Sequence, residues 1–322
     1  MVGGDAITVD GTGGNVDITN ETAEATVAAG DESTDLNYVA TSSLAMGGGV
    51  VQDLAGNNLT VTLPNPGDGA AENLAKNSDI VVDGIAPPVS LGTADKATDS
   101  HWKAASVITV YVDFSEDIAV TGTPQLTLVT KTNGTTTTID KNQIVDGDSL
   151  SFVYTVADGD GVQSLDYATT TSLALNGGTI KDTAGNDATL TLDTQGTANS
   201  LAGQKKLTVD TVGPTIVSVT KDALAGQTGT AAGYYNEGDR IYFHVNFTDD
   251  FSSGDDIVTV GAGGTPTITM ETREDGATDP SATFYSNRGS GSLRFRYTID
   301  DPEFSNALDY VDPTTSLTLN GG

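Results

Sequence analysis

Residues 165–186 decide the fold, and they read LDYATTTSLALNGGTIKDTAGN. Most of these words occur twice more in the chain. The earlier copy has LNY at 36–38, SLAMGG at 43–48 and DLAGN at 53–57, and the later copy has LDY at 308–310 and SLTLNGG at 316–322. Because each copy of such a stretch marks one unit of the architecture, the sequence predicts three copies of a single structural unit.

Other words repeat in the same order. DFSE at 113–116 corresponds to NFTD at 246–249, and FVYTV at 152–156 corresponds to FRYTI at 295–299. The separations run from 127 residues (Asp83 to Asp210) to 143 residues (Phe152 to Phe295). This length is too great for a solenoid repeat and suits one sandwich domain. We therefore predict a partial repeat, its back part, in residues 1–83, a complete repeat in 84–210, and a repeat lacking its last strands in 211–322.

The patterns within each unit are those of strands. Ile108, Val110, Val112 and Phe114 alternate with more polar residues, as in a half-buried strand. Turn-forming Asn, Asp and Gly clusters separate about seven such runs in the middle unit, the number of strands in an Ig-like sandwich. The predicted fold is all-β, with tandem Ig-like β-sandwich domains in a string. The predicted core aromatics are Phe114, Phe152 and Tyr154, then Phe247, Phe295 and Tyr297.

The chain is strongly acidic, with 44 acidic and 14 basic residues and a net charge of -30. Nucleic acid and anionic membrane surfaces are poor partners for such a chain, whereas divalent cations are natural ones. There is no cysteine, so no disulfide framework is expected. No stretch has the roughly 20 apolar residues of a membrane span. The opening residues do not resemble a signal peptide, so an export signal would lie outside this sequence.

Few residues suggest catalysis. His101 and His244 stand beside no obvious partner in the sequence, and His244 is predicted to be a solvated side chain on the outward face of its strand. No nucleophile with a nearby base can be assembled, so we predict no enzyme. The repeated tyrosines, Tyr38, Tyr167 and Tyr310, fit sandwich corners with a packed ring and a hydroxyl bonded to backbone. Four sequons permit glycosylation, at Asn20, Asn58, Asn133 and Asn246.

Several acidic loops supply the oxygen ligands that Ca²⁺ requires, six to eight per ion. The alternative is that these residues form turns by bonding nearby backbone N–H groups, and both interpretations stay open. The candidate ligands are Glu116, Asp117, Asp158, Asp160, Asp182, Asn186 and Asp210.

Three segments together resemble a known family: FSEDIAVTGTPQLTL at 114–128, SLDYATTTSLALNGGTIKDTAGNDATLTL at 164–192, and VDTVGPTIVSVT at 209–220. They are similar to the tandem Ig-like repeats of prokaryotic surface-layer (S-layer) proteins and giant adhesins, and most similar to the acidic S-layer proteins of ammonia-oxidising archaea. The resemblance implies a β-sandwich string at the cell surface, often with bound calcium, and it adds Asp83 to the candidate ligands. The third copy departs from the pattern, because Asp249 replaces the Glu of FSE and no DxAGN follows.

The expected function is structural, as part of an extracellular S-layer lattice subunit that associates with itself or with neighbouring repeats. The alternative is the extender stalk of a large repeat adhesin. Two interpretations follow from the incomplete first and third copies. Either the sequence is a window from a longer polypeptide, which needs no special mechanism and is preferred, or the first domain of one molecule completes the last domain of the next.

Overall fold

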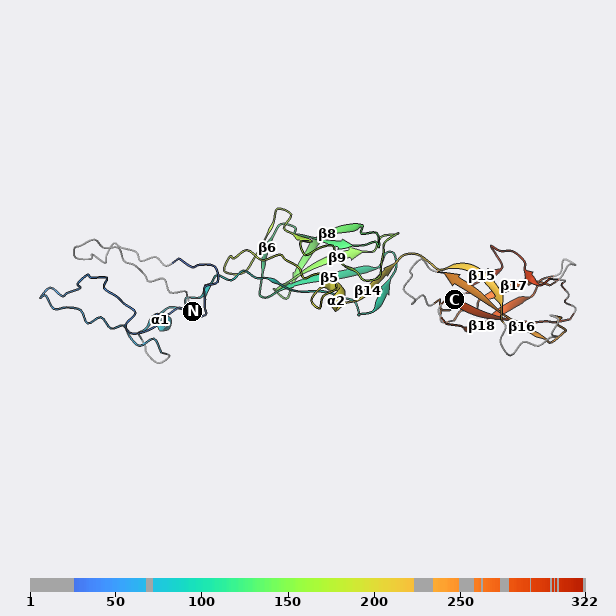
Figure 1. Ribbon diagram of the computed structural model, residues 1–322, viewed down its shortest axis with the longest axis horizontal. Coiled ribbons are helices and arrows are strands. Elements are labelled where there is room, and N and C mark those ends of the chain that lie inside the picture. Colours follow the sequence, from blue (N-terminus) through green and yellow to red (C-terminus); the bar gives the residue numbers. More distant parts are fainter. Residues whose placement is uncertain are drawn as a thin grey trace.

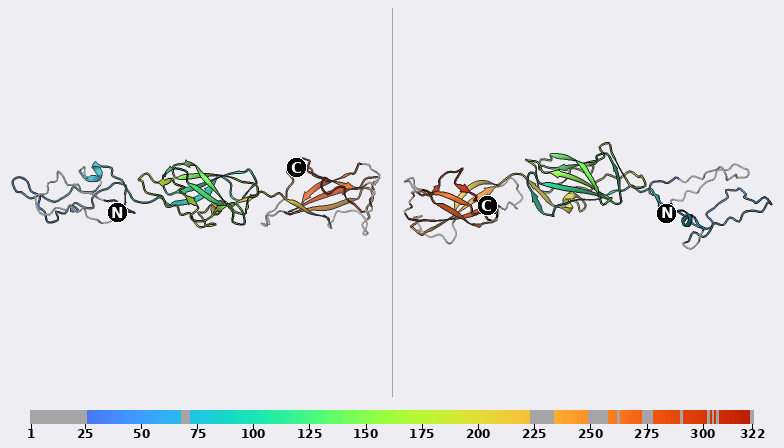
Figure 2. Two further views of the ribbon diagram at one scale, coloured as in Figure 1. Left: turned by 90° about the horizontal axis from the view of Figure 1, so that it is seen from above. Right: turned by 180° about the vertical axis from the view of Figure 1, so that it is seen from behind.

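The structure is a computed structural model that describes residues 26–67, 72–222, 234–248, 258–261, 263–272, 278–289, 291–301, 303, 305 and 307–320. Strands make up 40% of it and helices 3%, which confirms the all-β prediction. Figure 1 shows the chain as three successive parts along its long axis, and the two views of Figure 2 keep that order. We call residues 26–83 the first part, residues 84–210 the middle part, and the described residues from 214 onward the third part.

The middle part has one large antiparallel sheet. Its order is β11-β7-β8-β9-β5-β3, and β12 also pairs with β7. The strands are β3 (Val89–Ala94), β5 (Val107–Phe114), β7 (Gln125–Val129), β8 (Thr136–Val145), β9 (Ser149–Thr155), β11 (Asp166–Tyr167) and β12 (Leu173–Ala174).

Smaller elements complete the middle part. Strand β14 (Leu207–Asp210) lies between β10 (Gly161–Val162) and β4 (Ser100–Trp102), and its pairing with β4 is parallel. Strand β13 (Thr179–Lys181) pairs with β6 (Ala119–Thr121), and the short helix α2 (Leu201–Gln204) contacts β3 and β11. This is the arrangement of a β-sandwich, with one large sheet and a covering layer.

The core of the middle part lies between these layers. Residues of β5 alternate between buried and more accessible, as the sequence pattern predicts. Phe114, Phe152 and Tyr154 are all at most 2% exposed, which confirms them as core residues. The covering layer contributes side chains that are equally buried, namely Leu165, Leu192, Leu201, Leu207 and Val209.

The third part repeats the large sheet strand for strand. Its order is β15-β16-β19-β18-β17-β20, with β21 also pairing with β17. The strands are β15 (Thr215–Lys221), β16 (Arg240–Thr248), β17 (Thr267–Glu271), β18 (Ser281–Asn287), β19 (Ser292–Thr298), β20 (Asp309–Tyr310) and β21 (Leu317–Thr318).

Even the irregularities of the two sheets coincide. The β3–β5 ladder shifts between Val89 and Leu91, and the β15–β16 ladder shifts at the matching place, between Ile216 and Ser218. Such a bulge reaims the following side chains, so its recurrence means that both sheets present the same residues inward. Phe295 and Tyr297 are buried as predicted, and Phe247 packs against this core while only partly buried.

The first part has little regular structure. It holds β1 (Glu32–Ser33), which pairs with β2 (Val82–Asp83), and the helix α1 (Leu74–Asn77). In the described residues up to Asp83, Val82 is the only buried hydrophobic side chain. The short strands predicted near residues 7–9 and 16–18 lie outside the described residues.

The first part nevertheless carries the local bonds of the middle part. The Tyr38 hydroxyl donates to the backbone oxygen of Pro64 at 2.7 Å, as the Tyr167 hydroxyl donates to that of Asp193 at 2.6 Å. The polar caps of α1 and α2 also correspond, since a side-chain oxygen accepts from a backbone N–H in the first turn of each helix. These bonds confirm the predicted corner role of the first two repeated tyrosines. No comparable bond is printed for Tyr310 in the described residues.

Candidate functional site

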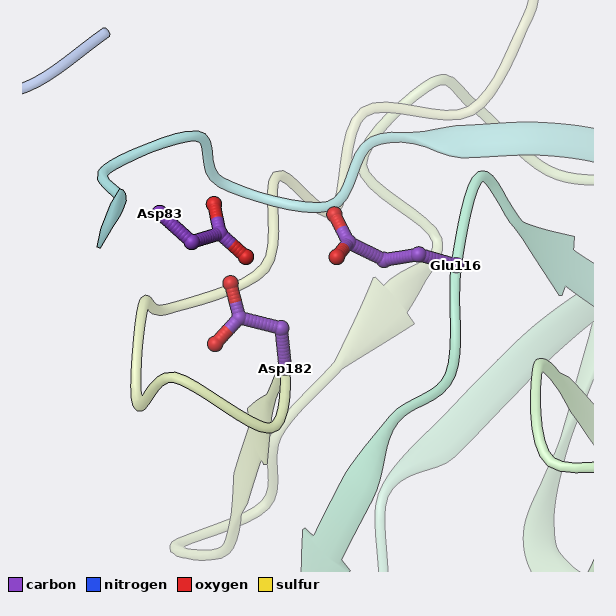
Figure 3. Close-up of side chains that lie close together, drawn as sticks. All are labelled: Asp83, Glu116 and Asp182. Atoms are coloured by element: carbon purple, nitrogen blue, oxygen red, sulfur yellow. The ribbon is translucent and has the colours of Figure 1, made fainter. Parts of the chain in front are cut away.

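Three carboxylates gather where the chain enters the middle part. Asp83 ends β2, Glu116 follows β5, and Asp182 follows β13. One oxygen atom from each side chain lies within 4.8 Å of the others. Figure 3 shows the three side chains pointing toward one another from three separate segments. Elsewhere in the part of the chain that the structure describes, no other such group of three potential metal ligands is found.

The repeated DxAGN word forms the turn that holds Asp182. The Oδ1 atom of Asp182 accepts from the backbone N–H groups of Gly185 at 2.6 Å and Asn186 at 2.8 Å. Gly185 has φ of +100°, a conformation that favours glycine and lets the chain close this turn. The turn therefore explains why Asp, Gly and Asn stand at this spacing.

Asn186 connects the turn to the incoming chain. Its Nδ2 atom donates to Oδ2 of Asp182 at 2.7 Å and to the backbone oxygen of Asp83 at 3.0 Å. Asp53 and Asn57 form the same turn in the first part, with Nδ2 of Asn57 donating to Oδ2 of Asp53 at 2.7 Å. Only the turn of the middle part meets two further carboxylates, so the word by itself makes a turn and the junction makes the cluster.

The carboxylates of the cluster differ in their electrostatics. Burial, followed by the charges of Asp83 and Asp182, raises the pKa of Glu116. Burial also acts on Asp182 and raises its pKa, but hydrogen bonds from Asn186, Gly185 and Ala184 outweigh it and hold the pKa below the ordinary value. Asp182 is thus a firmly ionised group, and Glu116 bears the repulsion. A bound cation would relieve that repulsion.

The structure brings together four of the predicted ligand residues: Asp83, Glu116, Asp182 and Asn186. Asp117 turns away to the loop of Gly147, where a Cβ on that glycine would meet its Oδ1 at 2.5 Å. The remaining three, Asp158, Asp160 and Asp210, lie near the chain's exit from the middle part, since β10 begins directly after Asp160 and its Gly161 pairs with Asp210.

Asp160 has a structural role there. It is 5% exposed, and its Oδ2 accepts from the Tyr154 hydroxyl at 2.7 Å and from the Ala157 N–H at 3.0 Å. Oδ1 of Asp210 accepts from the N–H of Val212 at 2.9 Å. These bonds are those of turn formation, the alternative weighed for acidic loops.

The prediction that His244 is solvated and lacks a partner is wrong. Its side chain is 17% exposed, its Nε2 lies 3.2 Å from Oδ2 of Asp222, and its Nδ1 lies 3.2 Å from Oγ of Ser292. The sequence hid these contacts, because Asp222 and Ser292 reach His244 across neighbouring strands. His101 is exposed on β4.

These residues form a polar network on the outer face of the third part. The Ser292 hydroxyl donates to Oδ1 of Asn246 at 3.1 Å, and Nε of Arg294 lies 2.6 Å from the same Asp222 oxygen that faces His244. The serine proton is therefore directed away from the imidazole, and the carboxylate is shared with a guanidinium. An activated serine needs the opposite arrangement, with its proton held by the base.

The sequons differ in accessibility. Asn58 and Asn133 are exposed, and Asn133 lies in the turn between β7 and β8, where its Oδ1 accepts from Thr135. Asn246 is half-buried, and its Nδ2 donates to Ser218 and Thr220. Asn20 lies outside the described residues.

No family model, curated protein or solved structure matches the chain. In the described residues, no helix has the length and apolar character needed to cross a membrane.

Proposed function

We propose that this chain is a structural protein of a prokaryotic cell surface, a component of an S-layer lattice built from tandem Ig-like repeats. The observation that carries the proposal is the internal repeat. Two parts share one seven-strand order, with a bulge at the same place, and the corner tyrosine bond recurs in the first part. A string of similar modules is suited to building or spanning, and the net charge of -30 suits an exposed surface in salt.

We further propose that the cluster of Asp83, Glu116 and Asp182 binds a divalent cation, calcium in the first instance. Carboxylates from separate segments are ligands that Ca²⁺ accepts, and backbone oxygens and water can complete its shell. Because Asp83 lies on the connection from the first part while Glu116 and Asp182 belong to the middle part, a shared ion would stiffen the joint. In a lattice or a stalk, stiff joints transmit load.

Calcium is expected to raise the melting temperature of the middle part, since a ligand that binds only the folded state adds stability by mass action. Glu116→Gln should remove most of that increase, measured by calorimetry in calcium and in chelator. The matched control is Asp53→Asn, which alters the same kind of turn away from the cluster. An equal increase with sodium at matched ionic strength would instead indicate general screening.

The calcium effect should also weaken in acid. The raised pKa of Glu116 means that this group gains a proton early as the pH falls, so cation and proton compete for it. Without calcium the sign is reversed for this group, because protonation through a raised pKa relieves repulsion and stabilises the fold. A calcium increment that stays constant while the pH falls through the titration of Glu116 would contradict the assignment.

Electron cryo-tomography of the source cell, with antibodies to this chain, tests the proposed function. A regular two-dimensional coat carrying the label is the expected result. Labelled filaments projecting singly from the cell would favour an adhesin stalk and overturn the lattice proposal.

A further inference from the structure

The first part exposes apolar residues whose counterparts are buried in the middle part. Offsets of 129 and 127 residues, given by the DxAGN words and by the Asp83–Asp210 match, pair residues 50–83 with 179–210, which hold β13, α2 and β14. Val51, Leu74 and Ile80 are 39%, 38% and 37% exposed. Their counterparts Ile180, Leu201 and Leu207 are at most 2% exposed, because the large sheet covers them.

The third part has the reverse surface. Its large sheet matches that of the middle part, and a cavity of about 980 Å³ opens over its inner face. The lining includes Val219, Ile241, Phe243, Met270 and Tyr297. In the middle part, the corresponding space is filled by the covering layer that contains Ile180, Leu201 and Leu207. No described residue of the third part stands at the counterpart of β13, α2 or β14.

We propose that residues 50–83 of one molecule dock into this cavity on the third part of a second copy, head to tail. The middle part serves as the template, since it contains both halves in contact. The occupant has the required elements: a helix matching α2 with Leu74 at its start, and β2 with Val82 matching Val209. The inference holds whether or not the chain forms a surface lattice.

Two features shape this interface. Residues 36–46 and 308–319 both correspond to 165–175, so one of the two must give way; β20 and β21 pair with β17 over only two residues each. Val219 stands where the middle part has Gly92, whose Cβ position lies 3.3 Å from the backbone nitrogen of Leu201. The incoming helix must therefore sit a few tenths of an ångström farther from the sheet than α2 does.

Sedimentation of the full chain at increasing concentration tests the proposal. The average mass should rise above 32.9 kDa, and Val51→Asp should weaken association roughly tenfold or more, because the new charge must be buried. Val153→Asp is the matched control, since Val153 is also 39% exposed but lies on the outer face of β9. A mass of 32.9 kDa at every concentration, or equal effects of the two variants, would overturn the proposal.

Cross-linking gives an independent test, because the chain has no cysteine of its own. Molecules with Leu74→Cys are mixed with isotopically labelled molecules carrying Val219→Cys and then oxidised. Heterodimers should dominate, since Leu74 and Val219 occupy the places of Leu201 and Gly92, which lie in contact in the middle part. Homodimers forming as fast as heterodimers would indicate random collision and contradict the docking.

Discussion

Phe152→Ala is expected to lower the free energy of unfolding of the middle part by about 3–5 kcal/mol, the usual cost of removing a buried aromatic ring. Phe152 is 0% exposed and lies on β9, paired with Val110 of β5 and Lys141 of β8. The measurement is chemical denaturation followed by tryptophan fluorescence. Trp102 is the only tryptophan of the chain and packs against this core, so its signal reports on the middle part alone.

Val153→Ala is the control for that experiment. Val153 is the next residue on the same strand, but it faces outward and is 39% exposed. Its replacement should change the free energy of unfolding by no more than about 0.5 kcal/mol, as for most surface substitutions. A loss below about 1 kcal/mol for Phe152→Ala would mean that the faces of β9 are assigned the wrong way round.

The inward faces could be predicted because alternation along a strand has a strict period of two. The same pattern at Ile108–Phe114 and at Ile241–Phe247 placed both strands correctly, and both lie centrally in their sheets. Strand order could not be predicted in this way. Nothing local states that β9 lies between β8 and β5, since that order depends on pairing across long loops.

The candidate site was predictable in its turns and not in its assembly. Asp182 and Asn186 are four residues apart, and their turn follows from local bonds. Asp83 reaches the same cluster from 99 residues upstream (182 − 83), and residue types alone do not encode that approach. The network at His244 escaped prediction for the same reason, because its partners lie on adjacent strands.

Gly178→Ala is expected to lower the free energy of unfolding by about 3 kcal/mol, at the upper end of overpacking costs. A Cβ on Gly178 would stand 2.2 Å from the backbone oxygen of Thr121 and 3.2 Å from that of Leu175. Neither oxygen belongs to a flexible side chain, so a backbone must move. The pairing of β13 with β6 begins at the next residue, where Thr179 faces Thr121, and it would be strained first. The same fluorescence titration measures the loss.

Gly177→Ala separates this steric effect from backbone strain. Gly177 has φ of +78° and nothing within 4 Å of its Cβ position, so alanine there meets open space in a left-handed conformation. That strain alone costs about 1–2 kcal/mol. Gly178→Ala should therefore be the more damaging change, although the two glycines are adjacent. Equal losses would mean that the chain moves freely around Thr121 and that the NGG word serves the turn only. A larger loss for Gly178→Ala would mean that the second glycine of this word is needed because two strands of the covering layer approach each other too closely for any side chain.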